Sequence, residues 1–203
     1  MSQLKLTADG GGGTVAIKAP ASTTGNAALE LTVPSTASDT LDSLKRAGNI
    51  LQVVSTTKTD TFSSSTTGSF VDVTGLSVAI TPTSSSNKIL VTAMCSVGNS
   101  GTGTRSGMKL VRGSTDIAIA DAAGSRTRAS FGTFNAHGNA ANTQVPTYVQ
   151  FLDSPSTTSA TTYKIQLNTG DASTMYVNRT GEDNDNSSEK RGVSTITAME
   201  VAA

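Results

Sequence analysis

Charged residues gather in one stretch of a chain that is otherwise rich in small residues. Asp121, Arg126 and Arg128 lie close together, and Arg112 and Asp116 come shortly before them. Guanidinium groups bind carboxylates and sulfates through paired hydrogen bonds, so this set could bind an acidic or sulfated glycan. Because cations and anions are mixed, the same residues could instead form a network that fixes a long loop or a subunit contact. We favour the second interpretation.

A second cluster offers oxygen ligands for a cation. Residues 182–189 read EDNDNSSE and include Asp183, Asp185 and Glu189. Calcium takes roughly six to eight oxygen ligands, so a loop of this composition could bind it. The EF-hand pattern is not met, because no glycine follows the third ligand position and Glu189 comes too early. A solvated loop tip is the alternative, and it is the interpretation that we favour.

The residue types of common catalytic sites are scarce. His137 is the single histidine and Cys95 the single cysteine, and they are far apart in the sequence. Cys95 lies in an apolar run, which predicts a small buried hydrophobic residue rather than a nucleophile. The glycines at residues 10–13 are not followed by the Lys-Ser/Thr pair of a phosphate-binding loop. We therefore expect neither enzymatic activity nor a cofactor. Paired carboxylates of a glycosidase stay open, because they could meet only in the fold.

The charge balance bears on the partners that this chain can have. Its 203 residues include 15 Lys and Arg and 15 Asp and Glu, so the formal net charge is zero. Nucleic-acid binders usually carry a basic excess, so we expect no nucleic-acid partner. No apolar run approaches the roughly 20 residues of a membrane-spanning helix. Residues 1–6 also lack the apolar core of a signal peptide, so we expect neither membrane insertion nor export.

The clearest structural pattern is strand, loop, strand over residues 76–97. Leu76, Val78 and Ile80 alternate with small or polar residues, which is typical of a half-buried strand. Pro82 ends this strand because it cannot donate to a ladder. The run Ile-Leu-Val at residues 89–91 is densely apolar and predicts a strand that is covered on both faces. We predict a hairpin here, preceded by a turn at Gly75.

Similar runs recur along the rest of the chain and predict an all-β domain over residues 49–203. They lie at residues 50–54, 70–73, 108–113, 116–120, 147–152, 162–167, 174–178 and 194–201. In the last run we expect Ile196, Ala198 and Val201 to face inward. Their spacing is too close for crossover helices, which favours an antiparallel, jelly-roll-like β-sandwich. Only 4% of residues are aromatic, so the core is thin and we expect a homotrimer to supply further burial.

Residues 1–48 are predicted to be an extended N-terminal arm. Short alternating runs at residues 15–17 and 29–33 indicate strands, and residues 39–46 indicate one or two turns of helix. The arm has too few large apolar residues to build a core of its own. Its strands should therefore pair with another chain or with the next domain.

A series of stretches between residues 68 and 201 resembles a module in structural proteins of tailed bacteriophages, especially marine ones. The stretches are FVDVTGLSVAITP (70–82), SNKILV (86–91), LVRGST (110–115), DAAGSRTR (121–128), FLDSP (151–155) with TY (162–163), YVNRTG (176–181) and STITAME (194–200). The arm, with GTVAIKAPAS at residues 13–22, is similar to leaders of other virion proteins of that kind. The resemblance implies a virion component, either a tail fibre or a capsid-surface protein, and a trimer.

This resemblance leads to an expected function. We expect a structural protein of the virion surface, made in the host cytoplasm, that docks through residues 1–48 onto other virion proteins. Capsid decoration is favoured over a tail fibre, because the chain is short and lacks coiled-coil heptads. The alternative is a tail-fibre tip that binds a host-surface glycan or protein. The scarcity of aromatic residues counts against that alternative.

Overall fold

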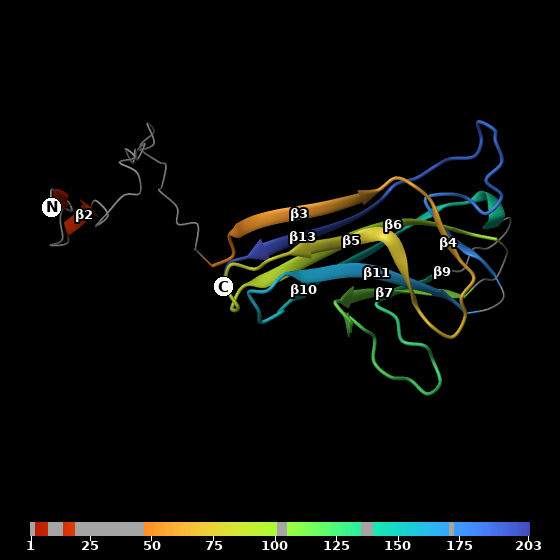
Figure 1. The fold of residues 1–203 in the computed structure, drawn as a ribbon, viewed down its shortest axis with the longest axis horizontal. Coiled ribbons are helices and arrows are strands. Elements are labelled where there is room, and N and C mark those ends of the chain that lie inside the picture. Colours follow the sequence, from red (N-terminus) through yellow and green to blue (C-terminus); the bar gives the residue numbers. More distant parts are fainter. Residues whose placement is uncertain (1–2, 8–13, 19–46, 101–104, 135–139, 171–172) are drawn as a thin grey trace. The chain divides into compact units, whose positions relative to one another are not determined.

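The structure is a computed structural model in two compact units, Met1–Asp42 and Ser43–Ala203. It describes residues 3–7, 14–18, 47–100, 105–134, 140–170 and 173–203 (Figure 1). The predicted strand at residues 29–33 and the predicted helix at residues 39–46 lie outside the described residues. The domain boundary after residue 48 therefore stays a prediction. Within the described ranges, no helix has the length and apolar character needed to span a bilayer.

The first unit contains an antiparallel hairpin of β1 (Gln3–Thr7) and β2 (Thr14–Lys18). The strand predicted at residues 15–17 is thus confirmed, but its partner strand was not predicted. The register pairs Leu4 with Ile17 and Leu6 with Val15. Apolar residue types therefore stand opposite each other at two positions of the hairpin.

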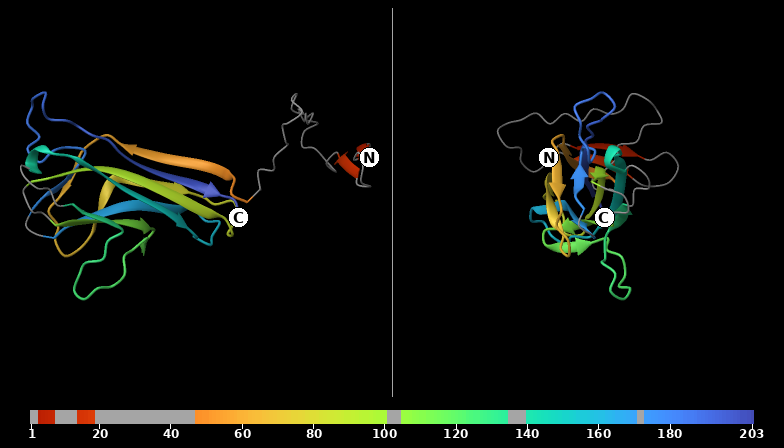
Figure 2. Two further views of the ribbon diagram at one scale, coloured as in Figure 1. Left: turned by 180° about the vertical axis from the view of Figure 1, so that it is seen from behind. Right: turned by 90° about the vertical axis from the view of Figure 1, so that its right-hand side faces the viewer.

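The second unit is an all-β sandwich of two antiparallel sheets, as the sequence predicts (Figures 1 and 2). The first, which we call the β6 sheet, has the order β3 (Ile50–Lys58), β13 (Ser194–Val201), β6 (Lys88–Asn99), β12 (Met175–Val177) and β4 (Phe62–Ser64), with β10 (Val145–Asp153) also paired to β6. The second, the β11 sheet, has the order β5 (Val71–Ile80), β11 (Thr161–Thr169), β7 (Ser106–Arg112) and β8 (Thr115–Ile117), with β9 (Phe131–Phe134) beside β7. A single 3-10 turn, η2 (Ala140–Asn142), completes the elements of the described residues. The arrangement is jelly-roll-like.

The core lies between the two sheets and is built from alternate residues of each strand. The buried apolar side chains of the two central strands are Ile89, Val91, Ala93, Cys95 and Val97 on β6, and Tyr163, Ile165 and Leu167 on β11. Cys95 thus has the buried position that the sequence predicts. Burial raises the pKa of its thiol to about 12, so the reactive thiolate does not form near neutral pH.

The hairpin predicted over residues 76–97 is wrong, although both of its strands are present. β5 belongs to the β11 sheet and β6 to the β6 sheet, so residues 81–87 cross from one sheet to the other. β6 carries inward apolar residues at every second position from Ile89 to Val97, and β5 does so from Leu76 to Ile80. That pattern is the same whether two strands pair within a sheet or face each other across a core.

The turn predicted at Gly75 is also wrong, because β5 runs through it without interruption. Gly75 has a φ of 81°, and the register with β11 shifts between Lys164 and Gln166. This combination is a β-bulge, whose positive φ suits glycine because it has no Cβ.

The tight turn predicted after residue 112 is confirmed. Arg112 of β7 pairs with Thr115 of β8, so Gly113 and Ser114 form the loop between them. The strand predicted over residues 116–120 ends earlier, at Ile117. Ala118 has a φ of 51°, which takes the backbone out of the extended conformation at that point.

Candidate functional site

The segment at residues 179–193, which we call the 179–193 loop, connects β12 to β13. These two strands pair with successive parts of β6. β12 pairs with β6 as far as Val177 opposite Val97, and β13 resumes with Thr195 opposite Met94. β10 pairs with the same part of β6 from its other side, so β12 and β13 lie end to end along one side. The loop therefore interrupts what would otherwise be one continuous strand beside β6. It extends from one end of the sandwich (Figure 1, blue).

Asn178 holds the sheet together where the 179–193 loop departs. Its side chain is fully buried, and its φ of 65° lies in the left-handed region that asparagine tolerates. Nδ2 donates to the carbonyl oxygens of Lys58 at 2.8 Å and Asp60 at 2.9 Å. Oδ1 accepts from the Ser194 hydroxyl at 2.6 Å. These bonds join the end of β3 to the start of β13 and replace ladder bonds that an interrupted strand cannot make.

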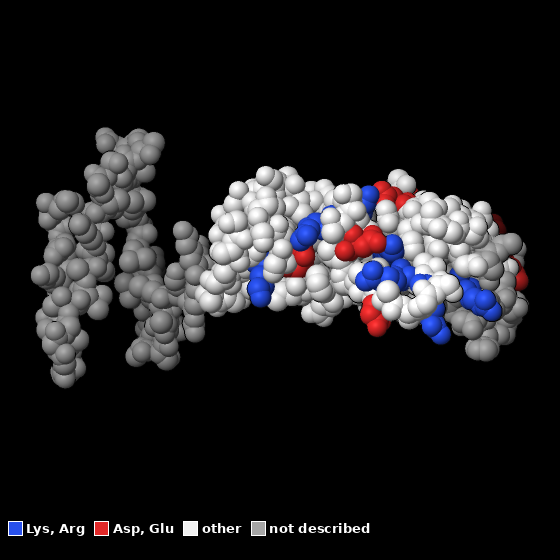
Figure 3. Space-filling view, turned by 90° about the horizontal axis from the view of Figure 1, so that it is seen from below, with Lys and Arg blue, Asp and Glu red and all other residues white. Residues whose placement is uncertain are grey.

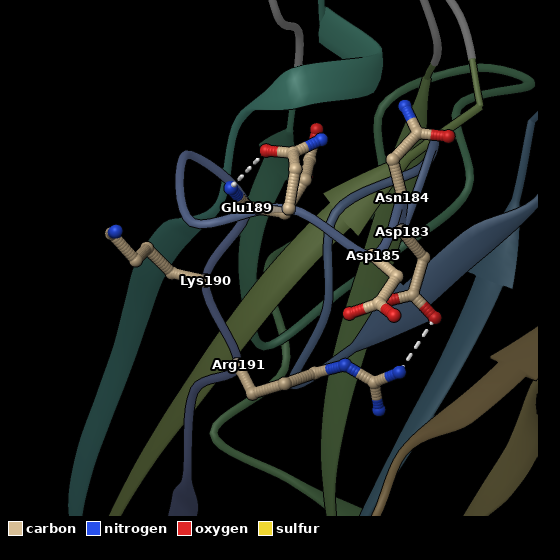
Figure 4. Close-up of a pocket in the computed structure, with 7 residues that line it drawn as sticks. Asp183, Asn184, Asp185, Glu189, Lys190 and Arg191 are labelled. Carbon is tan, nitrogen blue, oxygen red and sulfur yellow. Dashed lines mark hydrogen bonds and ion pairs between the residues drawn. The ribbon is translucent and has the colours of Figure 1, made fainter.

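The loop folds into a polar hollow (Figure 4). The hollow is lined by Asp183, Asn184, Asp185, Asn186, Glu189, Lys190 and Arg191. The Asp183 carboxylate accepts hydrogen bonds from Arg179 at 3.0 Å and from Arg191 at 2.8 Å. The Arg179 guanidinium also stacks on the Tyr176 ring at 3.9 Å from its centroid. Two guanidinium groups thus share one carboxylate at the base of the loop.

The tip of the loop is shaped by Asn186 and Glu189. Asn186 Oδ1 accepts from the backbone N–H of Ser188 at 2.9 Å. It also accepts from the backbone N–H of Glu189 at 3.3 Å (Figure 4). The Glu189 carboxylate accepts from the Thr180 hydroxyl, which closes the loop onto its own start. Local bonds of this kind fix a turn without any strand pairing. The carboxylates of Asp183 and Glu189 and the amide of Asn186 are therefore held in defined positions.

Asp183, Asp185 and Glu189, the predicted calcium ligands, line this same hollow. Two of the three carboxylates already have partners, since Asp183 is paired with two arginines and Glu189 with Thr180. In the described part of the chain, no three His, Cys, Asp or Glu side chains are arranged to hold a metal ion. Calcium binding here stays a prediction that requires the arginines to leave Asp183.

Arg112 and Asp116, two of the five residues of the predicted glycan site, have separate partners. Arg112 Nη1 donates to both carboxylate oxygens of Asp153, at 2.9 Å and 2.8 Å. Asp116 pairs with Lys109 at 2.5 Å across the outer side of β7 and β8. The structure therefore does not bring these two side chains into a common binding site.

The other three lie in the segment between β8 and β9 (Figure 1, green). Arg128 Nε donates to the carbonyl oxygen of Ala120 at 2.5 Å, and Arg126 Nη1 donates to that of Ala123 at 3.2 Å. Asp121 is exposed. The two arginines bond to the backbone of their own segment, which matches the second interpretation, a network that fixes a long loop. Glycan binding by these five residues stays a prediction.

Asp153 is a polar residue of the core that the sequence analysis missed. It ends β10 in the β6 sheet and is 5% exposed. Besides the two bonds from Arg112, it accepts one from the Tyr163 hydroxyl at 2.7 Å. Burial and the adjacent Asp153 carboxylate raise the pKa of Tyr163 well above its ordinary value, so the phenol stays a donor. Because Arg112 and Tyr163 belong to the β11 sheet, Asp153 joins the two sheets. The sequence Asp-Ser-Pro signals only the end of a strand.

Glu200 is the second residue that was missed, and it corrects the prediction that Val201 faces inward. Glu200 is fully buried, whereas Val201 is half-buried and follows a register shift in β13. One oxygen accepts from the Thr83 N–H at 2.6 Å, the Thr83 hydroxyl at 2.8 Å and Asn87 Nδ2 at 2.6 Å. The other accepts from Gln52 Nε2 at 2.5 Å. The period-two alternation of Ser194 to Ala198, continued, would have placed Glu200 inward.

The carboxylate of Glu200 is held by neutral donors alone. Burial by itself raises the pKa of Glu200, but the hydrogen bonds from Asn87, Gln52 and Thr83 outweigh it and hold the pKa at about 2. Thr83 and Asn87 lie in the segment that crosses between the sheets, and Gln52 lies on β3. Glu200 therefore fixes the crossing at one end of the sandwich, as Asp153 joins the sheets through a separate set of bonds.

No family model matches this chain, and no curated protein matches it in sequence. Among solved structures it is similar to chains of infectious bursal disease virus. The T=1 particles derived from that virus give a TM-score of 0.40 at 16% identity, over 98% of this chain and 45% of theirs. The VP2 subviral particle gives 0.38 at 16% identity over 94% and 47%, and the Gt strain gives 0.40 at 17% over 94% and 46%. This chain thus spans less than half the length of those chains.

Proposed function

We propose that this chain is a non-enzymatic structural protein of a tailed-bacteriophage virion. Its sandwich is displayed on the capsid surface, and its first unit docks onto another virion protein. Copies of the chain assemble into a homotrimer. In this role the chain is a structural β-sandwich with polar loops at its end, and it catalyses no reaction.

The observation that carries the proposal is the position of the residues on which the phage resemblance depends. The stretch at residues 151–155 contains Asp153, and Tyr163 and Arg112 belong to two others. The stretches at residues 86–91, 176–181 and 194–200 contain Asn87, Asn178 and Glu200. These are the side chains that join the two sheets and fix their loops. The resemblance therefore follows the framework of the sandwich and not a scatter of surface positions.

The first unit supports the docking part of the proposal. A two-stranded hairpin is marginal in water, and the register of β1 and β2 sets Leu4 opposite Ile17 and Leu6 opposite Val15. A partner surface would stabilise such a hairpin by burying it. The absence of coiled-coil heptads from the sequence favours the capsid surface over a fibre shaft.

Deleting residues 1–42 tests the proposal. The remaining chain is expected to fold and assemble as before but to be missing from purified virions. Leu6→Glu, opposite Val15 in the hairpin, is expected to reduce incorporation. Lys5→Glu, at the adjacent position opposite Ala16, should be incorporated normally. Incorporation of the truncated chain at full occupancy would show that docking uses the sandwich instead.

The hollow of the 179–193 loop favours a second candidate function, recognition of a host-surface glycan at a tail-fibre tip. Glycan hydroxyls pair with fixed amides and carboxylates of the kind that line this hollow. Asp185→Ala is then expected to reduce binding of the labelled protein to host cells, whereas Asp72→Ala, on the outer side of the β11 sheet, should not. Equal binding by both variants and the parent would exclude this hollow as the glycan site.

A further inference from the structure

The outer side of the β6 sheet carries three cross-strand rows of side chains on β10, β6, β13 and β3, which we call the apolar face. The rows are Leu152, Leu90, Met199 and Val53; Gln150, Thr92, Thr197 and Ser55; and Tyr148, Met94, Thr195 and Thr57. None of these residues is charged. The two outer rows hold the large apolar side chains, and the middle row is polar but partly paired within itself, since Ser55 and Thr197 share a hydrogen bond of 2.8 Å.

Much of this face is open to solvent in the single chain. Val53 is 55% exposed, Leu152 45% and Tyr148 66%. The dense apolar run of β6 predicts a strand covered on both faces, and the β11 sheet covers only the inner one. In the described part of Ser43–Ala203, the outer side is left uncovered. Leu90 lies in one row between exposed Leu152 and half-buried Met199. Adjacent apolar side chains on an outer surface are typical of a surface that another molecule covers.

The outer side of the β11 sheet is different. Asp72 pairs with Lys164 at 2.8 Å, and Lys109 pairs with Asp116 at 2.5 Å. Figure 3, which views the molecule from the side where β7 lies, shows Lys and Arg intermingled with Asp and Glu over the middle and one end. Charge depletion is therefore a property of one face and not of the whole surface. Charged residues are depleted at the centres of protein interfaces, where Tyr and Met are enriched.

We propose that copies of this chain meet through the apolar face. This inference rests on the proposed assembly of copies and adds the surface that they use. Residues close to a rotation axis meet their own copies, so a charged residue there would oppose a like charge. A face without charge removes that penalty. A shallow hollow beside Tyr148, lined also by Met94 and Thr195, offers a place for an apolar side chain of the neighbouring copy.

The size of the face fits a weak, reversible contact between copies. Its three rows span five residues on each of four strands, so at about 3.3 Å per residue and about 4.8 Å between strands the face presents an area of about 300 Å². Two such faces together bury about 600 Å², which lies in the range of weak and transient contacts. Recognition of a different protein usually depends on complementary charges. The three rows contain no charged residue that such a partner could pair with.

The test is sedimentation of the full chain and three single variants at concentrations from about 1 to 100 μM, a range that brackets weak and moderate self-association. Val53→Glu and Gln150→Glu place a carboxylate on two different strands of the apolar face. Ser77→Glu is the matched control, since Ser77 is exposed on β5 at the outer side of the other sheet. Circular dichroism of each variant checks that the β structure is retained. Both variants of the apolar face are expected to raise the dissociation constant at least about 30-fold, as for hot-spot residues, and the control should not.

Each other outcome overturns a defined part of the account. If the parent chain associates and the two variants associate equally well, the copies meet elsewhere, and only the assignment of the face fails. Equal dissociation of the Ser77→Glu control would mean that added charge, not this face, weakens assembly. A parent chain that stays monomeric at all concentrations would remove the proposed assembly itself, while incorporation into virions through residues 1–42 could still be tested.

Discussion

The two outer faces of the sandwich differ although their inner faces are alike. On β5, β11 and β7 the outward positions hold Asp72, Lys164 and Lys109, whose charges pair with neighbours on the same surface. On β10 and β3 the corresponding positions include Leu152 and Val53, whose side chains are exposed in the described part of the chain. Charged pairs satisfy a surface that remains in water, whereas exposed apolar rows are stabilised only when something covers them.

The contrast shows which part of a strand's sequence reports assembly. Alternation places one set of side chains inward in both sheets, and this set determines the fold. The other set is free to vary, so its composition records whether the outer side meets solvent or another molecule. In this chain the second set separates the β6 sheet from the β11 sheet.

The largest expected effect on stability comes from removing the bonds that join the two sheets. The two outer faces differ only while the inner faces stay packed against each other. Asp153→Ala leaves Arg112 and the Tyr163 hydroxyl without their acceptor. Removing one member of a buried ion pair costs about 3 kcal/mol or more, so the free energy of unfolding measured in urea should fall by that amount. Asp153→Asn should fall in between, because it keeps one acceptor. A loss below about 1 kcal/mol for the alanine variant would contradict the role of Asp153 as the link between sheets.

Glu200→Gln is expected to have the next largest effect. The new amide places a donor against donors from Asn87 or Gln52, which costs about 2 kcal/mol for a buried polar mismatch. The pH dependence has a defined sign. The pKa of Glu200 is lowered from 4.5 to about 2, so its stabilisation is present above pH 4.5 and is lost as the pH falls through about 2.

Urea unfolding of the parent and of Glu200→Gln between pH 2 and pH 6 measures this effect. The stability difference between the two proteins should be constant above pH 4.5 and should shrink toward pH 2. A difference that stays constant down to pH 2 would mean that the carboxylate is not held as the structure shows.

The smallest effect is expected on the charged face. Asp72→Ala removes a pair with Lys164 in which the aspartate side chain is 52% exposed. The hydrogen bond from Lys164 lowers the pKa of Asp72, yet a solvent-exposed pair contributes only about 0.5 kcal/mol. Neither stability nor assembly should change measurably beyond that. If this variant dissociates the copies, the interface lies on the β11 sheet and not on the apolar face of the β6 sheet.

The sequence was sufficient to predict the architecture but not the way the strands are paired. Alternation located the strands and the buried Cys95, because burial on one face leaves a direct trace at every second residue. The hairpin at residues 76–97 was wrong because pairing partners leave no such trace. Gly75 was misread for a related reason, since a glycine with positive φ serves equally in a turn and in a bulge.

The candidate site was predictable in part. The loop at residues 182–189 was identified by its composition, but the pairing of Asp183 with two arginines could not be, because Arg179 and Arg191 approach it only after the loop has folded. Asp153 and Glu200 were missed because a buried carboxylate is the exception among aspartates and glutamates. Only their donors, which are distant in the sequence, show why burial is tolerated.

Nitration of tyrosine tests the central claim, that the apolar face is covered by a copy of the chain. The chain has three tyrosines, of which Tyr148 is 66% exposed on the apolar face and Tyr163 is fully buried in the core. Peptide mass spectrometry after brief treatment of the assembled protein with tetranitromethane would report both. We expect Tyr148 to resist nitration in the assembled parent and to react readily in Val53→Glu, while Tyr163 resists in both. Rapid nitration of Tyr148 in the assembled parent would contradict the claim.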